Sequence, residues 1–314
     1  MDAILNHPRF TNEIAAREHL ESIRWPNGPI CPHCGSMKRN SKLNGDSHRA
    51  GLYFCGDCRE QFTVTVGTVF ERSKIPLHMW VLATHLICSS KKGMSSKQIE
   101  RELGVTYKTA WFMTHRIREA MKPTGNGLLG RGGKAVEADE TFVGRKPGSI
   151  KRRGYAHKEA VFSLVERQGS VRSFHVPDVT GATLKAKLQA NVAKKARLMT
   201  DDAGQYRHTK KEFPKHQVVN HSQYEYVSGA IHTNTVEGFF SIFKRGIYGV
   251  YQHVSSQHLE RYTTEFDFRY NHREKLGFTD TARTAAALNG ISGKRLTYRQ
   301  TDNKAKEIMG TICE

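Results

Sequence analysis

The segment KAVEADETFVG, residues 134–144, predicts the first strand of a mixed α/β domain. Residues 159–176, EAVFSLVERQGSVRSFHV, predict two further strands. A helix is expected over residues 183–196, TLKAKLQANVAKKA, and a short buried strand over residues 196–202, ARLMTDD. Three strands, a helix and a strand that ends in acids are the element order of a mixed α/β domain.

Three acidic residues of this domain are candidate metal ligands. Asp139 lies in the first expected strand and Asp201 at the end of the fourth. Glu237 lies in the first turn of a helix predicted by HTNTVEGFFSIFK, residues 232–244. Carboxylates from two strands and a helix can hold the hard divalent ions that phosphoryl transfer requires.

Each acid also has a simpler structural explanation. Asp139 can face solvent, and Asp201 with Asp202 can form a turn or cap a helix. Asn234 followed three residues later by Glu237 is a capping-box pattern. Taken one at a time, these explanations are the stronger ones, so the metal hypothesis depends on the three acids meeting in space.

Four of the six cysteines lie in C-x2-C motifs, and two do not. The paired ones form two C-x2-C motifs with 20 residues between them: Cys31, Cys34, Cys55 and Cys58. This spacing predicts a zinc ribbon with a structural Zn²⁺, because four thiolates satisfy a tetrahedral ion. Cys88 and Cys313 have no partner motif and are expected to be inert thiols.

Residues 94–121, MSSKQIERELGVTYKTAWFMTHRIREAM, predict a helix-turn-helix. The first helix is expected to end at Leu103 and Gly104, and the second to begin near Thr106. Five side chains of the second helix are expected to be available for DNA: Tyr107, Lys108, Thr109, Arg116 and Arg118. The alternative is an ordinary helical hairpin with a solvated basic face.

The charge balance indicates a polyanionic partner. The 314 residues include 49 Lys and Arg against 30 Asp and Glu, a net charge of +19 with a pI near 9.8. With 38% hydrophobic residues the chain is expected to fold, which excludes a disordered tail. There is no apolar run of membrane-spanning length and no signal-peptide pattern, so the expected location is cytoplasmic.

These patterns divide the chain into an expected series of modules, which makes the fold class multidomain α+β. The expected divisions are a zinc ribbon with an N-terminal helix over 1–75, a helix-turn-helix region over 76–121, a glycine-rich linker over 122–133, an α/β domain over 134–290 and a C-terminal tail over 291–314.

Three blocks resemble the conserved motifs of ISXO-type insertion-sequence transposases, the bacterial relatives of Merlin elements. They are VEADETFVG, LMTDDAGQY and HTNTVEGFFSIFKRGIYGVYQHVSSQHLERYTTEFDFRYNHR. RWPNGPICPHCGS, at the first cysteine pair, resembles the N-terminal zinc ribbon of the same family. The resemblance extends from about residue 10 to about residue 290.

The resemblance implies an RNase H-like catalytic domain with a DDE triad that binds Mg²⁺ or Mn²⁺. Carried over to this sequence, the triad is Asp139, Asp201 and Glu237, and the accompanying lysine is Lys244. Asn234 is implied to be the helix cap and a hydrogen-bond partner of the metal-binding carboxylates. The implied reaction is cleavage and transfer of DNA strands, and the implied partners are the terminal inverted repeats of an element and its target DNA.

Where the family usually shows Asp-Gly, this chain has Asp201-Asp202, so the second metal ligand is either of these residues, with Asp201 preferred. Glu140, next to Asp139, is expected to pair with a basic residue. Joining two DNA ends implies a homodimer or a larger assembly, associated with the nucleoid. Two alternative functions are a DNA-binding regulator built on the zinc ribbon and helix-turn-helix, and an RNase H-like nuclease that does not transfer strands.

Overall fold

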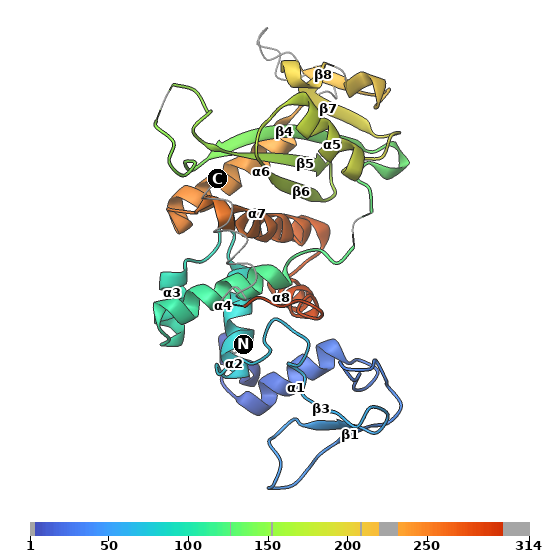
Figure 1. Ribbon diagram of the computed structural model, residues 1–314, viewed down its shortest axis with the longest axis vertical. Helices are drawn as coiled ribbons and strands as arrows, with labels where there is room; N and C mark the ends of the chain where they lie inside the picture. Colours follow the sequence, from blue (N-terminus) through green and yellow to red (C-terminus); the bar gives the residue numbers. More distant parts are fainter. Residues whose placement is uncertain (1–3, 126, 152, 208, 220–231, 298–314) are drawn as a thin grey trace, which may run out of the picture. The chain divides into compact units, whose positions relative to one another are not determined.

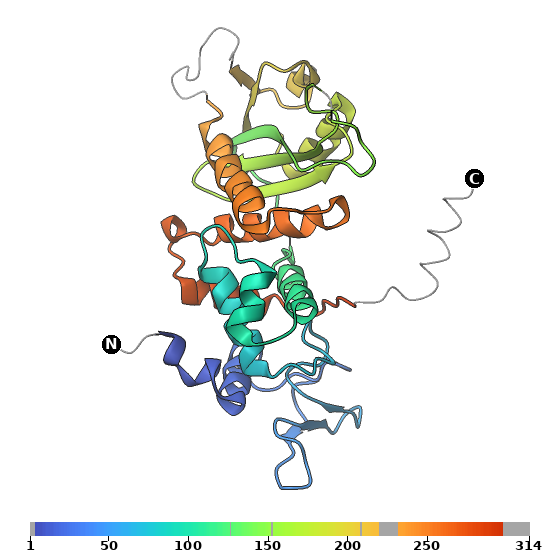
Figure 2. The same cartoon turned by 90° about the vertical axis from the view of Figure 1, so that its left-hand side faces the viewer.

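The computed structural model describes residues 4–125, 127–151, 153–207, 209–219 and 232–297, and Figures 1 and 2 show the ribbon from two directions. These residues fall into two compact units. The first comprises the described residues up to 84, residues 96–120 and those from 287 onward, and the second comprises residues 85–95 and 121–286. Cys313 and the expected tail beyond residue 297 lie outside the described residues.

The cysteine-bearing part of the first unit is a small antiparallel sheet. Its strands, in spatial order, are β1 (Asn40–Lys42), β2 (Tyr53–Cys55) and β3 (Gln61–Phe62). Trp25, Tyr53 and Phe62 stack or meet edge to face with ring centroids 5.3–5.8 Å apart. Such a small sheet buries little apolar surface, so it relies on this aromatic cluster and on its cysteines.

The remaining helices at this end of the chain include the expected helix-turn-helix. Helix α3 (Ser96–Leu103) and helix α4 (Tyr107–Ala120) pack together. Gly104, at the turn, has a φ of +63°, a left-handed conformation that glycine adopts at little cost. The other helices here are η1 (Ile4–Asn6), η2 (Pro8–Phe10), α1 (Glu13–Arg24) and α2 (Leu77–Ser89).

The second unit is built on a five-stranded mixed sheet with the strand order β6-β5-β4-β7-β8. The strands are β4 (Ala135–Val143), β5 (Glu159–Glu166), β6 (Val171–Val176), β7 (Arg197–Asp201) and β8 (Gln217–Val219). The first three pair antiparallel, whereas β7 is parallel to both β4 and β8. Three antiparallel strands, helix α5 (Gly181–Asn191) and a parallel strand confirm the predicted element order and the RNase H-like fold class.

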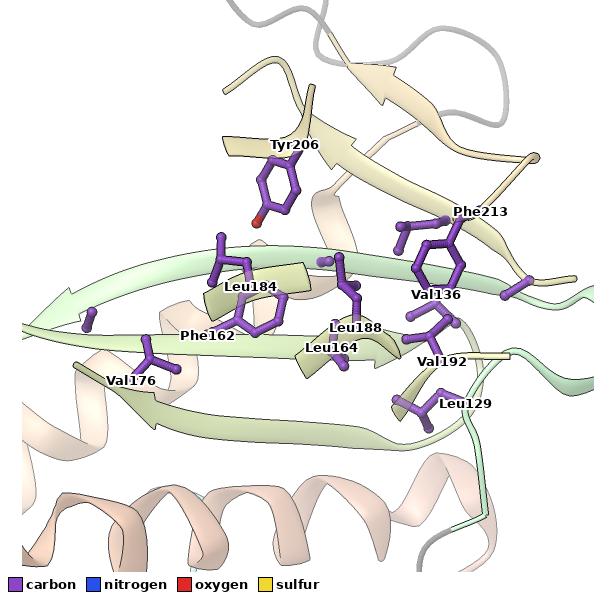
Figure 3. Close-up of a cluster of buried hydrophobic side chains, with 14 residues drawn as sticks. Leu129, Val136, Phe162, Leu164, Val176, Leu184, Leu188, Val192, Tyr206 and Phe213 are labelled. Carbon is purple, nitrogen blue, oxygen red and sulfur yellow. The ribbon is translucent and has the colours of Figure 1, made fainter. Parts of the chain in front are cut away.

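Alternation along the strands produces two cores on opposite faces of the sheet. On one face, Val136 and Ala138 of β4 belong to the same core as Leu184 and Leu188 of α5. Figure 3 shows Val136, Leu184 and Leu188 in this cluster. On the other face, Val143 packs with side chains of helix α6 (Asn234–Gly246) and helix α7 (Ser256–Asn271). Residues of β4 at odd positions therefore face α6.

The remaining elements are short, apart from α8, which begins in the second unit and ends in the first. They are η3 (Arg131–Gly133), η4 (Gly204–Tyr206), η5 (Thr209–Lys211), a π-helical turn at Ile247–Tyr251, η8 (Glu274–Leu276) and α8 (Asp280–Asn289). In the part of the chain that the structure describes, no helix has the length and apolar character needed to cross a membrane.

Candidate active site

Strand register places two of the candidate acids side by side. In the parallel pair β4 and β7, Val136 is opposite Leu198 and Glu137 is opposite Met199. Two residues further along each strand, the same register reaches Asp139 and Asp201. Residues that are opposite each other in adjacent parallel strands point to the same face of the sheet. The fold therefore directs both aspartates toward the face that α6 covers.

Asp139 interacts electrostatically with Glu237 as well as with Asp201. The pKa of Asp139 is raised to about 8, chiefly by burial of its carboxyl group. The negative charges of Glu140, Asp201 and Glu237 raise this pKa as well. Like charges raise the pKa of a neighbouring carboxyl group, and they do so more strongly in a partly buried site of low dielectric. The three candidate acids thus belong to one cluster of negative charge.

Glu237 lies on α6 as expected, but the predicted capping box is wrong. Helix α6 begins at Asn234, so Asn234 is its first helical residue, and the N-cap position belongs to Thr233. The Thr233 hydroxyl donates a hydrogen bond of 2.8 Å to Oε1 of Glu237. Asn234 and Glu237 are both exposed on the helix surface. Glu237 is therefore not used to cap its own helix.

The cap comes from Glu137, a residue that the sequence analysis did not single out. The fully buried Glu137 carboxylate accepts the backbone N–H groups of Thr235 (2.8 Å) and Val236 (3.0 Å) and the Thr235 hydroxyl (2.8 Å). These N–H groups have no partner within the helix, and an anion at this end also complements the helix dipole.

The Glu137 charge is neutralised by Arg167, whose Nε lies 2.5 Å from Oε1 of the carboxylate. Arg167 also donates to the backbone carbonyl of His232 at 2.8 Å, just before α6. Glu137 stands two residues before Asp139 on β4, and its partners stand one and two residues before Glu237. One buried carboxylate thus attaches the helix that carries Glu237 to the strand that carries Asp139.

Glu140 has a different environment from the one expected. Tyr206 donates its hydroxyl to Oε2 of Glu140 at 2.6 Å, and Gln205 donates to Oε1. The expected basic partner is wrong, because strand alternation directs Glu140 to the face opposite Asp139, where Tyr206 is part of the core. Burial raises the pKa of Glu140, and its charge adds to the repulsion on Asp139.

Asp202 and Lys244 are both exposed. Asp201 ends β7 and accepts the backbone N–H of Ala203 at 3.2 Å, whereas Asp202 lies beyond the end of the strand. Lys244 is seven residues after Glu237, and two turns of helix place it on the same stripe.

The four cysteines of the first unit form a compact cluster. The Sγ atoms of Cys31 and Cys58 are 3.6 Å apart, and those of Cys34 and Cys55 are 3.7 Å apart. A tetrahedron with Zn–S bonds of about 2.3 Å has edges of about 3.8 Å, so these thiols fit one Zn²⁺.

The thiol and carboxylate clusters differ in compactness. Among the described residues, the four cysteines are the one group of three or more His, Cys, Asp or Glu side chains whose donor atoms all lie within 4.8 Å of one another. Asp139, Asp201 and Glu237 do not meet this criterion as a group of three.

The expected DNA-contacting side chains of α4 divide into exposed and enclosed groups. Tyr107 is 45% exposed, Lys108 is exposed and Thr109 is half-buried. Arg118 is 1% exposed and donates to Oγ1 of Thr114, so the expectation of a DNA contact is wrong for this residue. Arg116 is half-buried and donates to the backbone carbonyl of Glu71. The helical repeat turns these later positions inward.

Comparisons with known proteins agree on one family. The model of the ISXO2-like transposase domain matches residues 128–271, and that of the transposase zinc-ribbon domain matches residues 11–61. The chain is 31% identical over 281 residues to the uncharacterized protein in transposable element ISH50 of Halobacterium salinarum, covering 83% of this chain and 91% of the relative.

Two solved structures show only weak similarity. A chain of the simian T-cell lymphotropic virus intasome in complex with PP2A regulatory subunit B56 gamma has a TM-score of 0.27 at 16% identity, over 64% of this chain and 66% of that one. A chain of a pre-cleavage Mos1 transpososome has a TM-score of 0.19 at 11% identity, over 69% and 80%. Scores this low establish no shared fold.

The zinc-ribbon cysteines and the five-stranded mixed sheet define the class of protein as an insertion-sequence transposase with an N-terminal zinc ribbon. More particularly, the chain belongs to the ISXO2-like family of DDE transposases.

Proposed function

We propose that this transposase binds the ends of its own element and catalyses divalent-metal-dependent cleavage and transfer of DNA strands. The observation that carries the proposal is the parallel register of β4 and β7, in which Glu137 is opposite Met199. Asp139 and Asp201 each lie two residues beyond this pair, so the two strands carry them toward the same face. Helix α6, attached to the same strand through Glu137, adds Glu237. We assign this chemistry to residues 134–290 and the structural zinc to Cys31, Cys34, Cys55 and Cys58.

Asp139, Asp201 and Glu237 would hold Mg²⁺ or Mn²⁺, because carboxylate oxygens suit hard cations. When bound, the ions would supply activation of water and of a freed 3′-hydroxyl for attack on a phosphodiester. The protein's own contribution is to fix the acids on a strand pair and a capped helix, and to place Lys244 where it can contact a phosphate.

DNA binding is supported by the net charge of +19 and by basic groups in the first unit. A hollow of about 290 Å³ in this unit is lined by Arg72, Lys74, Lys108 and Arg116 among other residues. Cations that line a hollow beside α4 can neutralise DNA phosphates. We assign the contacts with the terminal repeats to Tyr107, Lys108 and Thr109 at the start of this helix.

Two ends must be held together for strand transfer, so we assign the active form to a homodimer or larger assembly on the chromosome, where it would be associated with the nucleoid. Asn234 is exposed at the start of α6, on the same stripe as Glu237. We assign it a hydrogen bond to the metal-binding carboxylates.

The test uses labelled duplex DNA that carries the terminal inverted repeat, incubated with the full chain and Mg²⁺ or Mn²⁺. Wild type is expected to nick this DNA and to join the freed end to target DNA. Asp139→Ala is expected to do neither, while retaining its affinity for the DNA. Glu212→Ala is the matched control, because Glu212 is an acid of the same unit that pairs with Lys185 away from the cluster.

Each other outcome selects a different function. Nicking without joined products would indicate a nuclease, and binding without nicking would indicate a DNA-binding regulator. Cleavage by Asp139→Ala at the wild-type rate would refute the assigned site.

A further inference from the structure

The second unit contains a cavity that the proposed reaction does not use. Its volume is about 710 Å³, within the range of sites that bind small molecules. Its walls come from the segment after α2, from α6, from α7 and from the turn before α8. The lining comprises Ser89, Ser90, Lys91, Lys92, Phe239, Ile242, Arg245, Phe266, Arg269, Tyr270, Arg273, Glu274, Lys275, Phe278, Thr279, Asp280 and Arg283.

The rim of the cavity is strongly basic. Lys91, Lys92 and Lys275 are exposed, and within the described part of the chain none of these ammonium groups forms an ion pair. Seven cationic side chains line the cavity against two acidic ones. Arg283 is paired with Asp280 at 2.7 Å, and Arg269 is paired with the buried Glu265. Five of the cations then remain against Glu274: Lys91, Lys92, Arg245, Arg273 and Lys275. The surplus of positive charge favours an anionic occupant.

The wall beneath this rim is apolar and aromatic. Phe239 and Phe266 are buried, whereas Tyr270 and Phe278 are half-buried. Arg273 lies over the Tyr270 ring, with its guanidinium carbon 4.0 Å from the ring centroid. Ile242 leaves 42% of its surface exposed at the same cavity. An aromatic ring would pack against such a wall more favourably than water does.

A planar ring that also carries negative charge is the chemistry of a nucleotide. The backbone of an intact duplex supplies phosphates but keeps its bases stacked inside, so it leaves an aromatic wall without a partner. An unpaired base can enter a concave site and stack on aromatic side chains, while cations hold its phosphates. We propose that this cavity binds one unpaired nucleotide of the DNA on which the protein acts.

Helix α6 connects this cavity to the candidate active site. At about 100° per residue, Ile242 and Arg245 lie about 80–140° around the helix from Glu237. The same helix thus presents one stripe to the carboxylate cluster and the adjoining stripe to the cavity. An unpaired nucleotide held here would fix a DNA end relative to Glu237. The inference rests on the proposed function in taking DNA as the ligand.

The test measures binding of the full chain, without divalent metal, by fluorescence anisotropy. Three probes share one terminal-repeat duplex: a blunt end, a two-nucleotide single-stranded extension, and the same extension with abasic sites. The abasic probe retains the phosphates and lacks the rings. Wild type is expected to bind the extension about tenfold more tightly than the abasic probe.

Ile242→Ala and Phe278→Ala are expected to remove this base-dependent difference and to leave blunt-end affinity unchanged. The exposed Ile242 is the safer substitution for folding, so it keeps the test informative if Phe278→Ala is unstable. Lys275→Ala is expected to weaken both extended probes equally, because it removes a phosphate contact. Lys210→Ala, an exposed cation of the same unit outside the cavity, is the control.

Equal affinity of wild type for the normal and abasic extensions would overturn the proposal. So would an equal loss for all three probes in the cavity variants, which would indicate contact with duplex backbone. Because binding is measured without metal, its outcome is independent of cleavage. If the protein binds the normal extension more tightly than the abasic one but never nicks DNA, the proposed function is refuted and nucleotide binding by the cavity is supported.

Discussion

The thiol cluster and the carboxylate cluster both present cation ligands, yet they are built in opposite ways. Cys31 and Cys58 are 27 residues apart in the chain, and their sulfur atoms are 3.6 Å apart. Asp139 and Glu237 are 98 residues apart, lie on a strand and a helix, and interact through their charges. A site on neighbouring loops is closed by its own ligands, whereas a site on separate elements depends on how these elements pack.

The largest expected effect comes from substituting an acid of the carboxylate cluster, and it tests which acids belong to that cluster. Asp201→Ala is expected to lower single-turnover cleavage of terminal-repeat DNA by about 10³-fold or more, because a metal ligand is lost. Asp202→Ala is expected to remain within a few-fold of wild type, since Asp202 is exposed beyond the strand end. The reverse ranking would assign the second ligand to Asp202.

Substitution of Glu137 tests whether packing between β4 and α6 holds the carboxylate cluster together. Glu137→Gln keeps an oxygen for the α6 N–H groups but leaves the Arg167 charge without its partner. A small displacement of Glu237 is expected to lower the maximal cleavage rate by about 10²-fold, with little change in DNA affinity.

The control for Glu137 is Glu166→Gln. Glu166 is also buried, accepts the backbone N–H of Gly130 and pairs with Lys134, and neither of these partners is on α6. This control is expected to lower the melting temperature and to retain the cleavage rate. If both variants lose rate in proportion to stability, Glu137 has no positioning role.

Loss of zinc tests the thiol cluster. Cys31→Ser is expected to reduce bound zinc from one ion per chain to none, measured by atomic absorption, because three thiolates hold the ion poorly. The ribbon sheet should unfold, and affinity for terminal-repeat DNA should fall by about tenfold. The second unit is expected to keep its circular dichroism signal and its thermal transition. Full zinc stoichiometry in this variant would contradict the ribbon assignment.

The smallest expected effect concerns a carboxylate outside both sites. Asp267 on α7 accepts the backbone N–H and the hydroxyl of Ser173, both at 2.6 Å. Burial raises the pKa of Asp267 to about 7, although the Ser173 hydrogen bonds lower it. The folded state therefore binds this proton more tightly than the unfolded state, and the stabilisation present at acid pH is lost as the pH rises through about 7.

Asp267→Asn removes this titration. From pH 5 to pH 8, wild type is expected to lose the stabilisation that the Asp267 proton provides, whereas the variant has no such proton to lose. The melting temperature of the variant should therefore rise by a few degrees relative to that of wild type over this range. A difference that stays constant across this range would show that Asp267 does not titrate there.

Local signals predicted the helices of the first unit well. The turn at Gly104 and the polar start at Ser96 place α3 and α4 where they were expected, because capping and turn chemistry involve residues close in the chain. The same signals did not show that Arg118 is buried. Burial depends on what packs against a helix, which its own sequence does not specify.

The cap of α6 shows the same limit at the candidate site. The pattern of Asn234 and Glu237 predicted a local cap, but the helix begins at Asn234 and its N–H groups are bound by Glu137. No local motif identifies a partner 98 residues away. Two weak indications were present, a carboxylate inside an apolar strand and its position two residues from Asp139.

By itself, the sequence determined the zinc-ligand spacing, the strand and helix order of the main domain, the basic charge and the three candidate acids. These properties depend on residue type and on short-range periodicity. Tertiary structure decided which face of β4 each acid occupies, that Glu137 and Arg167 anchor α6, and that a basic, aromatic cavity adjoins this helix. These features arise from packing between elements distant in sequence, where register and burial, rather than local pattern, set which side chains meet.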